Sequence, residues 1–168
     1  MLTAIYPGTF NPLTYGHLDI LERAVKVFPK VIVATTESTE KEPIFTVSET
    51  VELIREVTKH LDNVEVCAFS GLLIDLAKAK GASVIIRGLR QTTDFEYEFQ
   101  MALMNRRLCD TIETVFFVTS LDYLYLSSSL VREIARNGGD VSLFVPKPVE
   151  HAIMQRLQGC GAIKKPTS

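Results

Sequence analysis

A histidine stands near the amino terminus where a glycine-containing loop turns into an amphipathic segment. The loop carries Gly8 and Thr9, and Thr14-Tyr15-Gly16-His17 opens the helical pattern. Free backbone N–H groups and the positive end of the helix dipole favour an anion at such a helix start. His17 and the Thr9 hydroxyl could reach that anion, although a lone histidine could also serve only to cap the helix. The segment predicts phosphate or nucleotide chemistry.

Two arginines follow a buried strand-like run in the segment Ile85-Ile86-Arg87-Gly88-Leu89-Arg90. Side chains at the carboxyl end of a parallel strand face the ligand crevice of an open α/β sheet. Guanidinium groups bind phosphate oxygens in a fixed geometry, so Arg87 and Arg90 could hold two different phosphates. The alternative is that they form surface ion pairs.

Two further segments carry groups that suit a phosphate. Ser127, Ser128 and Ser129 precede an apolar helical pattern, where their hydroxyls and free N–H groups could cradle an anion or simply cap the helix. Lys41 lies in the polar loop 36–43, where a cation could close over a ligand. Its acidic neighbours, Glu40 and Glu42, equally suit a neutralised exposed loop.

The elements that must position these residues follow a strand–helix alternation. Five short runs of β-branched and aromatic residues are each followed by a turn and a longer helical pattern. The runs are almost continuously apolar, which is typical of parallel strands buried on both faces. We therefore expect an α/β fold, a Rossmann-like, doubly wound, parallel five-stranded sheet with helices on both faces. The strands are expected at 2–6, 31–35, 64–69, 84–87 and 114–118.

Helices are expected between these strands. Thr46 and Glu49 have the spacing of a capping box. Gly81 is placed to end a helix over 72–80 in the left-handed conformation, and Asp94 is expected to open a helix that runs through Arg107. The remaining helices are expected around the apolar stripe 20–28, over 127–135 and after Pro148.

Composition limits the class of protein. The 168 residues, 46% of them hydrophobic, suit one domain over 1–163, with 164–168 expected to be a disordered tail. A net charge of −2 and a pI near 5.9 argue against a nucleic-acid binder. Three cysteines without CxxC spacing indicate neither a disulfide framework nor a zinc site. We expect a soluble, cytoplasmic protein, because no apolar run has the length of a signal peptide or membrane span.

Five segments, in this order along the chain, resemble the bacterial phosphopantetheine adenylyltransferases. They are YPGTFNPLTYGH at 6–17, the Lys41 loop, IIRGLR at 85–90, DFEYEFQMALMNR at 94–106 and SSSLVRE at 127–133. The first contains the TxGH form of the TxGH/HxGH signature of the nucleotidyltransferase superfamily. The pair IRGLR and DFEYE separates this family from nicotinate mononucleotide adenylyltransferases and glycerol-phosphate cytidylyltransferases.

This resemblance implies transfer of AMP from ATP to 4′-phosphopantetheine, giving dephospho-coenzyme A and pyrophosphate in the penultimate step of coenzyme A synthesis. It implies Mg²⁺ accompanying ATP, a homohexamer, and coenzyme A as a feedback inhibitor. No serine, cysteine or lysine is paired with an evident base, so we expect direct in-line displacement by the acceptor phosphate.

The resemblance also implies roles for individual residues. His17 stabilises the transition state and acts with Thr9, Lys41 and Arg90 in catalysis. Thr9, Lys41, Leu73 and Arg87 bind phosphopantetheine, and no protein ligand to a metal is expected. ATP is expected to contact Thr9, Phe10, His17, Gly88, Leu89, Arg90, Glu98, Tyr123, Leu124, Tyr125, Leu126, Ser127, Ser128 and Ser129.

Two residues depart from the pattern of the family, and two other functions compete. Asn11 stands where an aspartate is common, which puts a charge or metal contribution there in question, and Tyr123 stands where a tryptophan is often found. A nucleotidyltransferase for another acceptor, such as nicotinate mononucleotide, would keep Thr9, His17 and the serines. A non-catalytic adenine-nucleotide sensor would need neither His17 nor the acceptor-site cations.

Overall fold

A parallel sheet of five strands forms the centre of the molecule. In the computed structural model, which describes residues 2–37 and 43–159, the strand order is β3-β2-β1-β4-β5. The strands are β1 (Thr3–Gly8), β2 (Lys30–Thr35), β3 (Val64–Ala68), β4 (Val84–Leu89) and β5 (Glu113–Val118). This confirms the predicted doubly wound α/β class. Lys41 and the tail 164–168 lie outside the described residues.

The order of the strands reverses between β1 and β4, which makes their carboxyl ends the topological switch point of the sheet. The pairing of β1 with β4 extends only to Ile5 and Ile85, whereas β1 continues to Gly8 and β4 to Leu89. Ligands of open α/β sheets bind at such a point. The switch point therefore opens directly beside the segments that carry Thr9 and Arg87.

The predicted strands are found, but β1 and β4 each extend two residues beyond their predicted carboxyl ends. β1 and β4 were expected to end at residues 6 and 87, before Pro7 and Gly88. Pro7 instead pairs in register with Ala34, and Gly88 with Phe117. In β4, Arg87 and Gly88 both stay in register with β5. Proline and glycine were treated as breakers, but beyond Ile5 the strand β1 is paired only with β2, and such an edge-like position tolerates proline.

Six α-helices and one short 3-10 helix connect and follow the strands within the described residues. The predicted capping box of α2 is confirmed: Thr46 Oγ1 accepts from Glu49 N at 3.2 Å, and Glu49 Oε2 accepts from Thr46 N at 2.8 Å. Gly81 has the expected left-handed conformation, with φ of +62°. The helices are α1 (Tyr15–Val27), α2 (Val47–Thr58), α3 (Leu73–Ala79), α4 (Thr92–Leu108), η1 (Leu121–Tyr123), α5 (Ser128–Arg136) and α6 (Lys147–Gly159).

Two of these helices begin before the predicted residue. α4 starts at Thr92, so that Asp94 lies in its first turn, where a carboxylate interacts favourably with the helix dipole. α6 starts at Lys147 and includes Pro148 in its first turn, where the missing N–H of proline costs no helical hydrogen bond. Both differences lie at a helix start. Acidic residues and proline are favoured at several positions of the first turn, so their presence does not fix which residue comes first.

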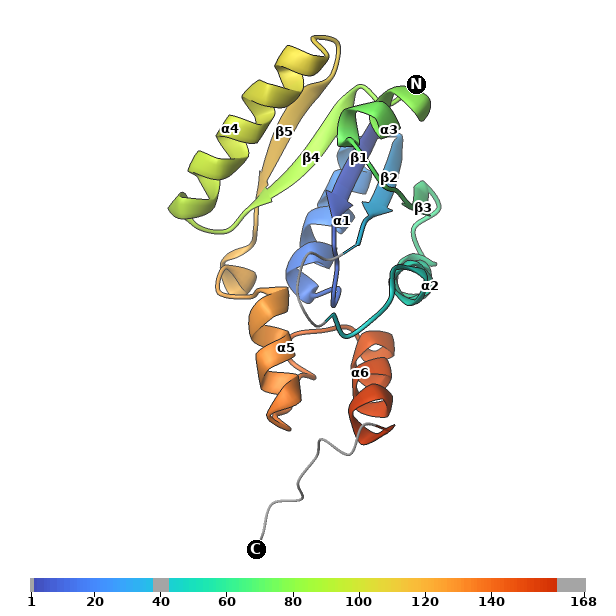
Figure 1. Cartoon of the computed structure of the whole chain (residues 1–168), viewed down its shortest axis with the longest axis vertical. Helices are drawn as coiled ribbons and strands as arrows, with labels where there is room; N and C mark the ends of the chain where they lie inside the picture. Colours follow the sequence, from blue (N-terminus) through green and yellow to red (C-terminus); the bar gives the residue numbers. More distant parts are fainter. Residues whose placement is uncertain (1, 38–42, 160–168) are drawn as a thin grey trace, which may run out of the picture.

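Alternate residues of the central strands point to two separate cores. Ala4 and Tyr6 pack on one side with residues of α1, α2, α5 and α6, whereas Ile5 packs on the other side with Ile74 and Ala77 of α3. Helices thus cover both faces, as predicted. Figure 1 shows α5 and α6 beyond the carboxyl ends of the strands, at the end of the sheet where the switch point opens.

Candidate active site

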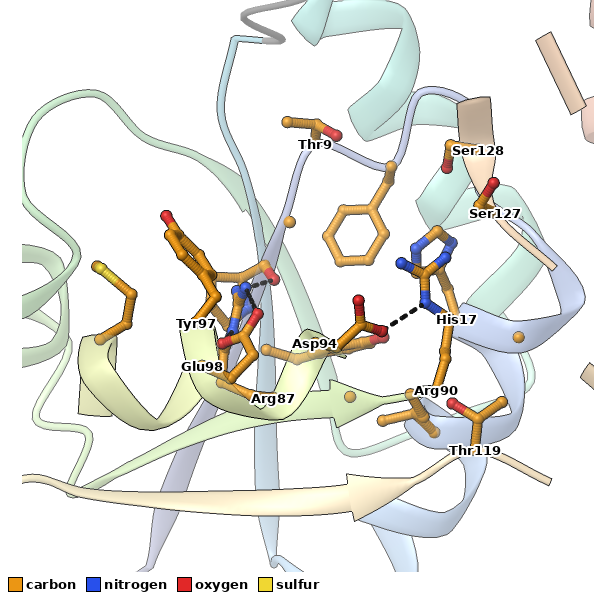
Figure 2. A pocket seen from close by; sticks show the side chains of 18 of the residues that line it. Thr9, His17, Arg87, Arg90, Asp94, Tyr97, Glu98, Thr119, Ser127 and Ser128 are labelled. Atoms are coloured by element: carbon orange, nitrogen blue, oxygen red, sulfur yellow. Dashed lines mark hydrogen bonds and ion pairs between the residues drawn. The ribbon is translucent and has the colours of Figure 1, made fainter. Parts of the chain in front are cut away.

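A cavity of about 680 Å³ opens at the switch point. Its walls come from the chain after β1, the starts of α1 and α5, the end of β4 and one side of α4. Figure 2 shows two groups of side chains in it: His17, Arg90, Thr119 and the serines on one side, and Arg87, Tyr97 and Glu98 on the other. The pocket therefore brings together clusters that are separated by more than a hundred residues in sequence.

His17 is held by the start of α1. Thr14 caps this helix, and its backbone N–H donates to Nδ1 of His17 at 3.1 Å. Because a backbone N–H can only donate, Nδ1 must be an acceptor, and the proton of the neutral imidazole is on Nε2. His17 thus takes part in capping α1, and this cap leaves a single N–H donor on the other ring nitrogen.

Phe10 packs against the other side of this imidazole. The two rings meet edge to face, with centroids 5.1 Å apart and planes at 77°. Gly8 makes room for the phenyl ring, because a Cβ on residue 8 would lie 2.9 Å from Cζ of Phe10. The Gly8-Thr9-Phe10 turn therefore fixes the orientation of His17 in addition to shaping the phosphate loop.

Arg87 and Glu98 form a bidentate ion pair at one side of the pocket. Arg87 Nε donates to Oε2 of Glu98 at 2.6 Å, and Nη2 donates to Oε1 at 2.5 Å. Nη1 donates to the carbonyl of Pro7 at 3.3 Å, so the same guanidinium connects β4 with β1 and α4. Burial disfavours the charged form of Arg87, but Glu98 outweighs it and the pKa of the guanidinium is raised. Arg87 is therefore a fixed cation in the pocket.

Arg90 connects the end of β4 with the chain that leads into α5. Its Nη1 donates to the carbonyl of Leu126 at 2.9 Å, and its Nε lies 3.4 Å from Oδ2 of Asp94. The next residue along, Ser127, caps α5 by accepting from the N–H of Leu130 at 3.2 Å. Two cations and the starts of two helices consequently face one cavity, an arrangement suited to a polyanionic ligand.

Comparisons with known proteins show the family of this chain. The cytidylyltransferase-like family model matches residues 5–134. The phosphopantetheine adenylyltransferase of Alkaliphilus metalliredigens is 53% identical over 156 residues, which cover 93% of this chain and 99% of that relative. The namesake from Heliobacterium modesticaldum is 54% identical over 149 residues, 89% of each chain. The chain belongs to the phosphopantetheine adenylyltransferase family.

A solved structure confirms the fold beyond the family. The putative nicotinate-nucleotide adenylyltransferase of Vibrio parahaemolyticus superposes with a TM-score of 0.68 and covers 96% of this chain and 95% of its own. Only 16% of the residues are identical, so this likeness concerns the fold alone. Both chains share the Rossmann-like architecture predicted from the strand–helix alternation.

Most of the residues expected to bind substrates in this family line the pocket. They are Thr9, Phe10, His17, Leu73, Arg87, Gly88, Arg90, Glu98, Leu126, Ser127, Ser128 and Ser129. Leu89, Tyr123, Leu124 and Tyr125 are not among the lining residues, and Lys41 lies outside the described part of the chain. Tyr123 stacks on Tyr15 with centroids 6.1 Å apart, and Tyr125 meets Phe144 edge to face. The substrate contacts of the lining residues and of these others all stay predictions.

Asn11, the departure from the family pattern, has a structural task. Its Oδ1 accepts from the N–H groups of Ile44 at 2.9 Å and Phe45 at 3.2 Å, and its Nδ2 donates to the carbonyl of Phe45 at 2.6 Å. An ionised carboxylate could not make the last of these bonds, because it has no proton to donate. The amide therefore anchors the chain at 44–45 and is not a lining group of the pocket.

Sequence reasoning missed a stripe of α4 that lines the pocket. Besides Glu98, this helix contributes Asp94, Tyr97, Met101, Ala102 and Asn105. These positions recur at intervals of three and four residues, which places them on one face of a helix. That periodicity was available in the sequence, but the mixed polarity of the stripe concealed it.

The protonation of His17 is expected to depend on pH in an unusual range. Burial, and then the charge of Arg90, lower the pKa of the imidazole to about 4. The unfolded chain takes up this proton near 6.5, so stability falls as pH drops from about 6.5 towards 4. We expect the His17 signals in a nuclear magnetic resonance titration to stay unchanged from pH 8 to 5.5. A titration midpoint above pH 6 would contradict this expectation. The variant His17→Gln should lose less stability than wild type as pH drops from about 6.5 towards 4.

Proposed function

We propose that this protein transfers the AMP group of ATP to 4′-phosphopantetheine and releases dephospho-coenzyme A and pyrophosphate, the penultimate step of coenzyme A synthesis. The observation that carries the proposal is one pocket that holds a helix-start histidine with its Nε2–H free of the cap and two arginines at opposite sides. Relatives more than half identical over nearly the whole chain are named for this reaction.

The mechanism we propose is a single in-line displacement. A phosphate oxygen of phosphopantetheine attacks the α-phosphorus of ATP, the new O–P bond forms, and the bond to pyrophosphate breaks. Nε2–H of His17 donates to an oxygen of the transferred phosphoryl group, and Arg90 offsets the charge that develops there. Catalysis then comes from positioning and from fixed donors, since the acceptor phosphate is already a nucleophile.

The acceptor is proposed to bind at the side of the pocket that contains Arg87. Its phosphate would contact the guanidinium of Arg87 and the hydroxyl of Thr9, and its apolar arm would lie along Leu73. All three residues line the cavity. Figure 2 shows Arg87 on the side away from Ser127 and Thr119, with Thr9 between the two sides at the top of the view. Two polyanions would then meet between Arg87 and His17, which is the geometry that an in-line transfer needs.

Magnesium is proposed to arrive with ATP. In the described parts of the chain, no group of three or more His, Cys, Asp or Glu side chains is placed to hold a metal ion. The two pocket carboxylates, Asp94 and Glu98, are both paired with arginines. The residues present therefore do not fit a protein-held Mg²⁺ site, and the phosphate oxygens of ATP with water are the ligands that this ion prefers.

We also propose that the chain forms a homohexamer. α4 and the end of β5 expose large apolar side chains, a pattern that marks contact surfaces. Phe99, Leu103, Met104, Leu108 and Val118 are between 47% and 62% exposed. Light scattering should give six times the 18.8 kDa mass of one chain; the mass of a monomer would contradict the proposal.

The remaining proposals concern inhibition and compartment. Coenzyme A contains both the pantetheine arm and the adenine nucleotide, so we expect it to compete in the same pocket. We place the protein in the reducing cytoplasm, because Cys67 and Cys109 are free thiols. None of the helices in the described residues is long and apolar enough to cross a membrane.

An acceptor comparison tests the function. The purified protein is mixed with Mg-ATP and either 4′-phosphopantetheine or nicotinate mononucleotide, and pyrophosphate release is followed together with the mass of the adenylylated product. We expect release with phosphopantetheine alone. Release with the mononucleotide alone would transfer the assignment to that acceptor. ATP binding without release from either mixture would favour a nucleotide sensor.

A further inference from the structure

The hydroxyl of Thr119 is a buried polar group with nothing to bond. Among the described side chains, its Oγ1 is the buried nitrogen or oxygen that lacks a hydrogen-bond partner, and the residue is only 3% exposed. Folded proteins rarely leave such a group unpaired, because its lost hydration is then uncompensated. Thr119 lines the pocket, and Figure 2 shows it there below Arg90. Its missing partner is therefore to be sought in a ligand.

The backbone on both sides of Thr119 is fixed. Its own N–H donates to the carbonyl of Leu89 at 2.9 Å. Ser120 is clamped by Asp19 of α1, whose Oδ1 accepts from Ser120 Oγ at 2.6 Å and whose Oδ2 accepts from Ser120 N at 3.1 Å. The hydroxyl of Thr119 is consequently preorganised, and a partner that reaches it meets a donor and acceptor of defined position.

The place of Thr119 in the pocket indicates which part of a ligand it meets. Its Cγ2 lies 3.9 Å from the position that a Cβ on Gly16 would take, at the same helix start that presents His17. Figure 2 shows Thr119 on the side of His17, Arg90 and Ser127, away from Arg87 and Glu98. Under the proposed function, the phosphates of the nucleotide would take the N–H groups and cations at this helix start, which leaves its nucleoside to contact Thr119.

We propose that the Thr119 hydroxyl hydrogen-bonds a polar atom of the nucleoside of ATP, on its base or ribose, and so contributes to selecting this substrate. This inference rests on the proposed adenylyl transfer for the identity of the nucleotide. It assigns Thr119 to substrate binding in addition to the residues that the family resemblance predicts. The unpaired hydroxyl is then the cost that the ligand-free protein carries for this contact.

Replacing Thr119 with valine tests the inference, because valine has nearly the same shape and lacks the hydroxyl. We expect Thr119→Val to weaken ATP binding about tenfold, as measured by calorimetry, the scale of one lost hydrogen bond. KM for phosphopantetheine should stay unchanged, and the Tm of the ligand-free variant should not fall. Thr119→Ser keeps a hydroxyl and should bind ATP more tightly than the valine variant. Unchanged ATP affinity in Thr119→Val would overturn the inference.

Thr50→Val is the matched control. Thr50 is also buried, but its hydroxyl donates to the carbonyl of Thr46 at 2.9 Å in α2, outside the pocket. This variant should lower Tm and leave ATP affinity unchanged, the opposite of the result expected for Thr119→Val. A fall in ATP affinity of similar size in Thr50→Val would show that the loss at Thr119 is a general effect on the fold.

Nucleotide analogues distinguish the base from the ribose. Inosine triphosphate alters the base, whereas 2′-deoxy-ATP and 3′-deoxy-ATP each remove one ribose hydroxyl. The difference between wild type and Thr119→Val should disappear with the analogue that lacks the partner atom, which locates the contact at the 6-position of the base or at one ribose hydroxyl. Weaker ATP binding in Thr119→Val together with an inactive wild type would instead reject the transferase and retain the nucleotide contact.

Discussion

Replacing His17 with alanine is expected to lower kcat by about 10²-fold or more, the scale of losing one preorganised transition-state donor. ATP affinity should fall much less, because the N–H groups of the α1 start and the Arg90 cation remain. The physical reason is the single proton on Nε2, which the Thr14 N–H at Nδ1 leaves aimed into the pocket. Steady-state kinetics and ATP calorimetry on the same preparation measure the two effects. A kcat within a fewfold of wild type would remove His17 from the mechanism.

His17→Gln separates catalysis from helix capping. In the alanine variant the Thr14 N–H loses its partner, which costs about 1 kcal/mol of stability. Glutamine suits the same position of a capping box, so its side chain should accept from Thr14 and restore most of the lost Tm. We expect kcat to stay low, since the amide does not present a ring N–H at the same place. Recovery of kcat along with Tm would mean that His17 acts only by capping α1.

Replacing Arg87 with methionine should have two distinct effects. KM for phosphopantetheine should rise about tenfold or more, because the acceptor phosphate loses a fixed guanidinium. The variant should also lose about 2 to 3 kcal/mol of stability, since the carboxylate of Glu98, with only 11% of its side chain exposed, is left without its cation. Acceptor kinetics and denaturant unfolding measure the two effects separately.

The double variant Arg87→Met with Glu98→Gln tests whether these effects are independent. Removing the orphaned charge should recover much of the stability, whereas the acceptor KM should stay high. Recovery of both would show that Arg87 acts on the site only through folding. Arg55→Met is a matched surface control: its 2.7 Å ion pair with Glu52 is exposed, and its loss should cost less than about 1 kcal/mol and leave both KM values unchanged.

The Arg87–Glu98 pair bears on two predictions from the sequence. Arg87 was expected to bind phosphate, with an ion pair as the alternative, and Glu98 was expected to contact ATP. The structure pairs them with each other, and both residues line the pocket. An ion pair at such a position orients the cation, so pairing and phosphate binding are compatible functions.

Sequence reasoning found candidate site residues that stand together in a short motif. It missed roles that depend on contacts between segments far apart in the sequence. The TxGH segment and IIRGLR were sufficient to predict the pocket, because parallel strands place all their carboxyl ends at one edge. Asn11 and Thr119 were not predictable in their roles. Asn11 bonds the backbone more than 30 residues away, and the orphaned hydroxyl of Thr119 is evident only once its neighbours are placed.

The ends of the predicted strands and the conformation of one loop residue were likewise not predictable from local propensity. Pro7 and Gly88 favour a break when read alone, but both lie in strands whose partners continue beside them. Phe10 adopts a left-handed φ of 45° that its residue type does not favour. Its ring is buried against His17 and Tyr6, and this packing offsets the unfavourable backbone conformation. Tertiary contacts thus decided the conformation where propensity indicated otherwise.

The stereochemistry at the transferred phosphorus tests the central claim, direct transfer between two bound substrates, most directly. One diastereomer of ATP with sulfur on the α-phosphate is converted with phosphopantetheine, and the configuration of the thiophosphate product is determined by ³¹P nuclear magnetic resonance. A single in-line displacement predicts inversion. Retention would mean two displacements and an adenylyl-enzyme intermediate, and would contradict a mechanism in which His17, Arg87 and Arg90 position the substrates without forming a bond to them.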